Sequence, residues 1–215
     1  MYELIILGLL MRFPAHGYFI ANVINDMIGP YARLSNGRLY PLLAKLEQEG
    51  LIVGSTSTEE TPRGERQQRS YEITDAGRER FHKLMIDTTS NPGEYQKLFL
   101  HKVPLLHLVK HSERLYLLDH YLNYCQAHIL HLMAESEYLA SRANAPVSLS
   151  QLETILDVMQ HRIDEWRLEL EWAGQLREKE LARAEILDEQ GKCVRGATGK
   201  QSVSRGPIEA KEGIS

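Results

Sequence analysis

The stretch SNGRLYPLLAKLEQEG, residues 35–50, has the pattern of a short helix with two different faces. Its leucines recur at i, i+3, i+4 and i+7, which places all of them on one buried side. Ser35 is a suitable N-cap, and Gly50 suits the left-handed position that follows a helix end. The stretch therefore predicts a helix that packs on a protein core.

The face opposite the leucines lacks bulky side chains. It consists of Gly37, Pro41, Ala44 and Gln48, flanked by Tyr40 on one side and by Arg38 and Lys45 on the other. A helix that enters the major groove of DNA needs a slim ridge for close approach and cations for the phosphates. A short core helix whose outer face happens to be small would show the same pattern, so the stretch alone leaves both interpretations open.

Two helices are predicted ahead of this stretch, at residues 3–12 and 16–28. Pro14 separates them, because proline disfavours helical geometry in the residue before it. In the second helix apolar residues again recur at the spacing of a buried face. The three predicted helices follow one another closely enough to share a core.

A β-hairpin and a fourth helix are predicted after it. The β-prone segment 51–53 and the alternating segment 70–74 form the strands, and the polar segment 59–66 forms a charged loop between them. The fourth helix ends near Ile86. Three helices, a hairpin and a helix within residues 1–87 are the elements of a winged helix-turn-helix DNA-binding domain.

Arginines gather on the predicted hairpin, the wing of such a domain. A charged loop tip is commonly no more than a solvated surface, but here it follows a slim helix edged by cations. Together they predict that the helix reads the major groove while the wing grips the backbone or the minor groove. The expected DNA-contacting residues are Ser35, Asn36, Gly37, Arg38, Tyr40, Pro41, Lys45, Arg63, Arg66 and Arg69.

The charge of the chain permits DNA binding without establishing it. The net charge of the 215 residues is −4, but residues 1–104 are balanced, with 12 Lys or Arg and 12 Asp or Glu. Residues 105–178 carry 6 and 11, so the excess of acid lies in the C-terminal half. A local basic footprint matters for DNA more than the sum over the chain.

Composition excludes several other classes of protein. No apolar run reaches the ~18 residues of a membrane span, and the N-terminal residues lack the basic flank of a signal peptide. Cys125 and Cys193 give neither a disulfide framework nor a metal-binding spacing, so a cytoplasmic location is expected. Motifs for phosphate binding or hydrolysis are missing, and we expect no enzymatic activity, no cofactor and no metal.

The C-terminal half predicts two long antiparallel helices within residues 112–178. Apolar or small residues follow heptad spacing from Leu115 to Leu139 and again from Leu149 to Ala173. These seams could simply close on each other within one chain. However, Ile155 and Trp172 lie off the second seam, and we expect an isologous homodimer through this domain.

Two further segments complete the predicted organisation. Residues 88–111 contain a break at Thr88–Gly93 and a short helix, which suits a junction or hinge between the domains. Residues 179–215 become rich in Gly, Ser and Lys, which predicts a disordered extension.

Residues 3–87 resemble the PadR family of bacterial transcriptional regulators. The resemblance rests on SxGxLYPLLxxLExEGLI at residues 35–52, on RxYxITxxGR at residues 69–78 and on HGY at residues 16–18. The helical half is similar to the longer branch of the family, whose C-terminal domain dimerises. The resemblance implies a homodimer on a pseudo-palindromic operator, usually a repressor that a small molecule releases, with phenolic acids as the namesake effectors. Arg38 departs from the family, which often has a small residue there.

Histidines recur at i, i+4 spacing in the helical half, and such pairs can bind zinc. No cysteine or carboxylate completes a zinc site, so we expect these side chains to line an effector pocket between the two domains. The expected effector-binding residues are His16, Tyr18, His120, Tyr124 and His128.

The function expected from the sequence is that of a dimeric, sequence-specific transcriptional regulator, most simply a repressor relieved by a small-molecule effector. A partner-dependent activator is one alternative. A protein-interaction adaptor that uses the acidic helical hairpin is another, and it would bind promoter DNA no better than random DNA at the same salt concentration.

Overall fold

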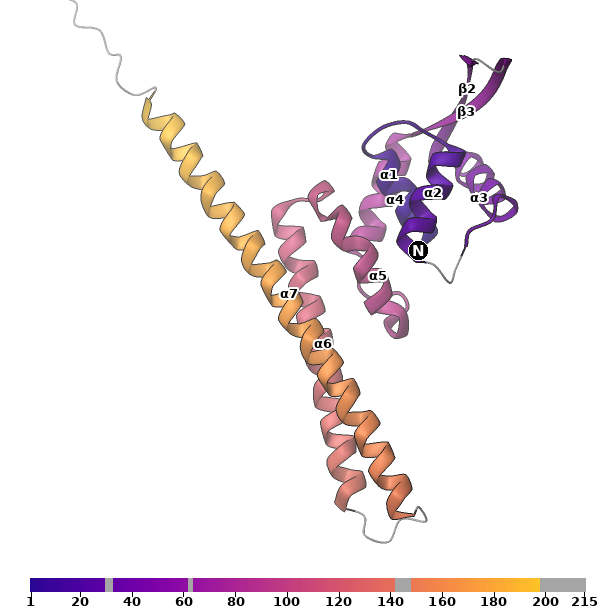
Figure 1. Cartoon of the computed structure of the whole chain (residues 1–215). Helices are drawn as coiled ribbons and strands as arrows, with labels where there is room; N and C mark the ends of the chain where they lie inside the picture. Colours follow the sequence, from indigo (N-terminus) through magenta and orange to yellow (C-terminus); the bar gives the residue numbers. More distant parts are fainter. Residues whose placement is uncertain (30–32, 62–63, 142–147, 198–215) are drawn as a thin grey trace, which may run out of the picture.

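The computed structural model describes residues 1–29, 33–61, 64–141 and 148–197, with the backbone alone described for 57–61, 64–68 and 184–197. It is mainly helical with one small antiparallel sheet, as expected (Figure 1). The elements are α1 (Tyr2–Leu10), β1 (Ala15–His16), α2 (Gly17–Ile28), α3 (Asn36–Gln48), β2 (Ile52–Thr61), β3 (Gly64–Ile73), α4 (Asp75–Ile86), η1 (Pro92–Glu94), α5 (Tyr95–Lys102), η2 (Val103–Leu108), α6 (His111–Ser141) and α7 (Leu149–Ala197).

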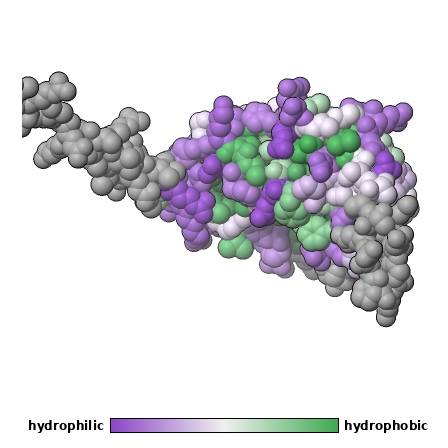
Figure 2. Space-filling view, turned by 90° about the horizontal axis from the view of Figure 1, so that it is seen from above, coloured by the Kyte–Doolittle hydropathy of each residue, from purple (hydrophilic) through white to green (hydrophobic). Residues whose placement is uncertain are grey.

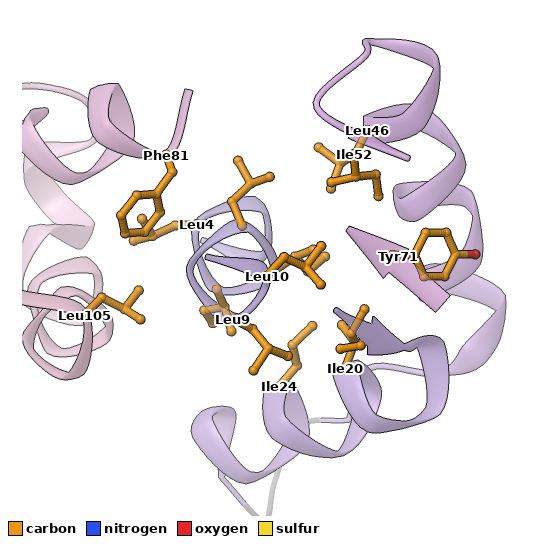
Figure 3. Close-up of a cluster of buried hydrophobic side chains, with 14 of the residues drawn as sticks. Leu4, Leu9, Leu10, Ile20, Ile24, Leu46, Ile52, Tyr71, Phe81 and Leu105 are labelled. Carbon is orange, nitrogen blue, oxygen red and sulfur yellow. The ribbon is translucent and has the colours of Figure 1, made fainter. Parts of the chain in front are cut away.

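The first helix, α1, is the centre of the winged-helix core. Every residue from Leu4 to Leu10 is buried, because α2, α4 and the sheet surround the helix. Figure 3 shows its leucines between Ile20 and Ile24 of α2, Phe81 of α4 and Tyr71 of β3. Burying a side chain of this size stabilises the fold by about 1.5–3 kcal/mol.

Helix α3 forms as its leucine spacing predicts. Leu39, Leu43 and Leu46 are buried, and the helix continues through Pro41. At its end Gly50 has a φ of 72°, and the N–H group of Leu51 donates to the Leu46 carbonyl at 2.9 Å. This is the glycine-terminated helix end that the sequence predicts.

The sheet has the strand order β1-β3-β2. The hairpin register runs from Ile52 opposite Ile73 to Thr61 opposite Gly64. The prediction of a loop over residues 59–66 is therefore wrong outside residues 62–63, which the structure does not describe. Backbone hydrogen bonds continue the ladder even where the sequence is polar throughout.

The two-residue strand β1 was not predicted. Ala15 pairs with Tyr71 and His16 with Ser70, so the segment between the first two helices joins the wing. A strand of two residues has too few positions to show alternation, and only its partner strand reveals it.

Helix α4 begins where the predicted cap stands. The Oγ1 atom of Thr74 accepts a hydrogen bond from the N–H group of Gly77 at 3.1 Å. A β-carbon on Gly77 would lie 2.0 Å from the carbonyl oxygen of Leu51, so this turn requires glycine. The start of α4 thus packs directly against the start of the hairpin.

Residues 88–111 bridge two cores. Leu105 and Val109 pack into the winged-helix core with α1, as does Leu117 of α6. Tyr95 and Phe99 of α5 belong instead to a second cluster, which the helical half completes with Leu118, Tyr121, Cys125 and Ala173. The junction is therefore folded against both parts of the chain.

Helices α6 and α7 run side by side in opposite directions (Figure 1). The predicted heptad positions are buried or half-buried except Leu149, which is 81% exposed. Trp172 packs edge-on against Phe99 within the chain and is half-buried, whereas Ile155 is exposed. Residues 142–147, at the predicted turn, lie outside the described part.

Helix α7 continues to Ala197, which corrects the prediction of a disordered extension from residue 179. Glu180 is buried, and its Oε1 atom accepts hydrogen bonds from His111 Nδ1 at 2.9 Å and from Arg114 Nη1 at 2.7 Å. This long-range contact holds the helix past the point where its apolar pattern fades. Residues 198–215 are outside the described part.

Among the described residues, none of the helices combines the length and the apolarity that crossing a bilayer requires.

Candidate nucleic-acid interface

The outer face of α3 is open to solvent. Gly37, Pro41 and Ala44 are exposed on the ridge, and Tyr40 is 47% exposed beside it. The other residues that the sequence places on this helix as DNA contacts are also exposed: Ser35, Asn36, Arg38 and Lys45. No described part of the protein covers the ridge, so another molecule can approach it closely.

The edges of α3 carry available positive charge. Arg38 makes no ion pair with any described residue. The Nζ atom of Lys45 lies 3.7 Å from Glu49 Oε1, and both side chains are exposed. Exposed ion pairs of this kind are weak, so a phosphate can displace Glu49 from Lys45.

Tyr40 rests on the HGY segment. A β-carbon on Gly17 would lie 3.1 Å from Tyr40 Cε1 and 3.2 Å from its Oη. The glycine therefore makes room for the tyrosine ring on the face of α3. Sequence reasoning singled out both residues but did not connect them, because the contact joins α2 to α3.

The wing meets α3 through Arg69, which the sequence predicted as a DNA contact. Its Nη2 atom lies 2.7 Å from both carboxylate oxygens of Glu47, on α3. The guanidinium also lies 5.6 Å from the centre of the Tyr71 ring. Arg69 is thus engaged within the domain. Arg63 and the side chain of Arg66 fall outside the described residues.

Seen from above, the described surface mixes apolar and hydrophilic groups (Figure 2). The apolar side chains exposed in the winged-helix domain include Phe13, Tyr18, Phe19, Tyr40 and Val53.

A second group of side chains lies in the helical half. The α6 residues Tyr124 and His128 are in edge contact, with ring centres 4.5 Å apart, and His128 stacks on Trp166 of α7 at 4.3 Å. His120 contacts Tyr95 of α5 edge-on at 5.0 Å. The structure therefore brings together the three α6 residues predicted for effector binding.

Polar atoms inside this group lack partners. The Tyr95 hydroxyl and the Nδ1 atom of His120 are buried without a hydrogen bond to any described residue. Burial lowers the pKa of His120 and the nearby charge of Lys102 lowers it further, while burial is also the main cause of the lowered pKa of His128. Neutral imidazoles here can donate or accept a hydrogen bond.

Three members of this group were not predicted: Tyr95, Lys102 and Trp166. Lys102 is completely buried, with its Nζ atom 5.9 Å from the centre of the Tyr95 ring. Heptad spacing marks Trp166 as a core residue only, and sequence reasoning assigned no role to Tyr95 and Lys102. Their place beside His120 and His128 depends on how α5 and α7 pack on α6.

His16 and Tyr18, also predicted for effector binding, lie elsewhere. His16 pairs with Ser70 in the sheet, and Tyr18 is 74% exposed on α2. Figure 1 shows α2 grouped with α1, α3 and α4 rather than with α6. Pairing of β1 with β3 holds His16 in the winged-helix domain, and Tyr18 lies on α2 of the same domain. Within the described part of the chain, no cluster of three or more His, Cys, Asp or Glu could hold a metal ion.

Several known proteins are similar to this chain over part of its length. Residues 6–83 match the Transcriptional regulator PadR-like family. The negative transcriptional regulator PadR of Bacillus subtilis (strain 168) is 28% identical over 145 residues, 67% of this chain and 78% of that protein. The solved structure of Bacillus subtilis PadR in complex with operator DNA is 22% identical, with a TM-score of 0.38, over 82% of this chain and 96% of that one. The same regulator in complex with p-coumaric acid is 22% identical, with a TM-score of 0.34, over 83% and 94%. Residues 6–83 of this chain therefore form a domain of the PadR-like family of transcriptional regulators.

Proposed function

We propose that this chain is a homodimeric, sequence-specific repressor whose binding to operator DNA is relieved by a small-molecule effector. The exposed ridge of α3 carries the proposal, because Gly37, Pro41 and Ala44 leave room for a groove while Arg38 and Lys45 stand at its edges. Similarity to a negative regulator favours repression over activation. A partner-dependent activator remains the second candidate.

In this proposal residues 1–87 bind DNA and their contacts divide into two classes. Arg38 and Tyr40, on the exposed face of α3, read base edges in the major groove. Lys45 and the wing residues Arg63 and Arg66 neutralise phosphates. The first class determines which sequence is preferred, and the second raises affinity for all sequences.

Residues 112–178 form the dimer in this proposal. Leu130, Val158 and Leu168 are 58%, 52% and 69% exposed on α6 and α7, which leaves apolar surface for a second copy. A two-fold dimer presents two α3 helices to half-sites about 34 Å apart, or a multiple of that distance. One winged helix alone would read only a few base pairs.

The effector binds in this proposal among Tyr95, His120 and Tyr124. The aromatic rings supply apolar walls, and the unpartnered hydroxyl and imidazole nitrogen supply hydrogen bonds. Tyr124 Oη donates to the Pro92 carbonyl at 2.8 Å, which links this site to the segment after α4. An effector that prefers one arrangement of residues 88–93 would therefore change the spacing of the two α3 helices.

The test is DNA binding measured by fluorescence anisotropy. DNA from upstream of the protein's own gene and of its chromosomal neighbours is compared with random DNA of the same length and at the same salt concentration. We expect one upstream segment to bind at least 100-fold tighter than random DNA, and p-coumaric acid or another hydroxycinnamate to reduce that binding. Equal affinity for all duplexes would support the adaptor alternative instead.

A transcription assay separates the two regulatory candidates. A repressor reduces transcript from the bound promoter when added alone to purified RNA polymerase. An activator leaves it unchanged or raises it. Sedimentation equilibrium of the full chain measures the dimer independently of DNA.

A further inference from the structure

We propose that Glu47 and Arg69 are positioning residues for DNA specificity, which hold the wing in one fixed position relative to α3. The proposal rests on the proposed DNA-binding function. Arg69 Nη2 lies 2.7 Å from both Oε1 and Oε2 of Glu47, so one donor group bridges the whole carboxylate. The two residues are 22 positions apart and belong to α3 and β3.

The surroundings are built around this pair. The N–H group of Gly54, on β2, donates to Glu47 Oε1 at 3.0 Å. A β-carbon on Gly54 would lie 2.5 Å from Arg69 Nε and 2.8 Å from Glu47 Oε1, so any other residue would displace the pair. The guanidinium carbon of Arg69 also lies over the ring of Tyr71, which is buried, at 5.6 Å from the ring centre. One carboxylate thus joins the helix to both strands of the wing.

The position of the pair at the base of the wing explains why it matters for DNA. Beyond Gly54 the strand β2 continues to Thr61, and Figure 1 shows the hairpin projecting away from the helices. Seven residues of strand span about 23 Å. A rotation of about 10° at the base therefore moves the tip by about 4 Å, which is more than the length of a hydrogen bond.

Exposure argues that the pair is not a major source of global stability. The Arg69 side chain is 52% exposed and that of Glu47 is 29% exposed, and solvent weakens such pairs. Turning the wing at its base takes less free energy than unfolding the domain, so a weak contact can control the direction of the wing. A fixed wing and α3 then meet one duplex geometry together, and this raises discrimination between sequences.

The competing role for Arg69 is direct contact with a phosphate, in which case Glu47 is only a competitor for its charge. The two roles predict opposite effects for Glu47→Met. If Glu47 only competes for Arg69, removing its carboxylate frees Arg69 and tightens binding to every duplex. If Glu47 positions the wing, removing its carboxylate lets the wing move and weakens binding to the operator relative to random DNA.

The experiment uses the full chain, the variants Glu47→Met and Arg69→Met, and the double variant. Operator and random DNA are titrated over a range of salt concentrations. We expect each single variant to reduce the ratio of operator to random affinity about tenfold, and the double variant to be no worse than either. The slope of log affinity against log salt concentration should be the same for Arg69→Met as for the wild type. Lys45→Met is the matched control. Its plot of log affinity against log salt concentration should become less steep by about 0.9, because a phosphate contact is lost.

The proposal would be overturned if the salt dependence of Arg69→Met became less steep by about 0.9 and Glu47→Met bound DNA more tightly. Hydrogen exchange of the Gly54 amide gives a readout without DNA. Exchange should quicken in Arg69→Met, which keeps the Glu47 acceptor of this amide, and unchanged protection there would also overturn the proposal. If the wild type does not distinguish any duplex from random DNA, the proposed function fails, while the exchange measurement still decides whether the pair fixes the wing.

Discussion

The ammonium group of Lys102 donates a hydrogen bond to the backbone carbonyl of Asp87, although the lysine side chain is completely buried. Asp87 follows the last residue of α4, and Lys102 is the last residue of α5. The bond therefore ties the end of the winged-helix domain to the helix that enters the second core. Burial lowers the pKa of Lys102 to about 8, and the nearby Asp87 charge offsets only part of the effect.

Replacing Lys102 should change how stability depends on pH. Since the pKa is about 8 in the folded protein and 10.5 without burial, the unfolded chain binds the proton more tightly between these values. The free energy of unfolding should therefore rise by about 3 kcal/mol as pH increases through that window. Lys102→Met should lack this rise. Urea unfolding of both proteins from pH 7.5 to 10 measures the difference, and a constant difference would contradict the assignment.

The carboxylate of Glu180 predicts an acid-sensitive contact. Burial raises its pKa, but the hydrogen bond from His111 and the charge of Arg114 outweigh burial, and the net pKa is lower than usual. The contacts of the Glu180 carboxylate therefore stabilise the folded protein above pH 4.5, the ordinary pKa of a glutamate. This stabilisation is lost as the pH falls below that value. Glu180→Gln should cost about 1–3 kcal/mol at pH 7 and flatten the acid dependence in urea unfolding. The exposed neighbour Glu178→Gln is the control and should behave like the wild type.

Two glycine-to-alanine changes should have opposite effects. Gly77→Ala places a β-carbon 2.0 Å from the Leu51 carbonyl oxygen and should destabilise the protein by about 3 kcal/mol or more. Gly174→Ala, in the middle of α7, meets nothing within 4 Å and should stabilise by about 0.5–1 kcal/mol, because alanine favours helix. Thermal unfolding followed by circular dichroism compares them. Equal effects would show that the turn before α4 can relax.

Substitutions on α3 should separate base reading from phosphate binding. Arg38→Ala and Tyr40→Ala should each reduce discrimination between operator and altered operator by about 1–3 kcal/mol at the contacted position. Lys83→Ala, an exposed cation on α4, is the control and should leave discrimination unchanged. Anisotropy with a set of single-base operator variants provides the measurement. A uniform loss over all variants would assign Arg38 and Tyr40 to the phosphates.

Much of the winged-helix domain could be predicted because its signals are local. The leucine period of α3, the glycine at residue 50 and the threonine cap of α4 each act within a few residues, and the structure confirms all three. The heptad spacing likewise predicted that α6 and α7 pack on each other. The small outer face of α3 is also a local property, since a residue opposite the core face of a helix points to solvent.

What the sequence determined by itself is the longer helices, the base of the hairpin and the face that each of them buries, because these depend on propensity and period. The tertiary structure alone decided that Arg69 binds Glu47, that Lys102 reaches Asp87, that Tyr95 joins the α6 residues and that Glu180 holds α7 beyond residue 178. Such contacts join residues 15 to 69 positions apart. Which residues meet in these contacts depends on how whole helices and strands pack together. The pattern of neighbouring residues in the sequence does not reveal that packing.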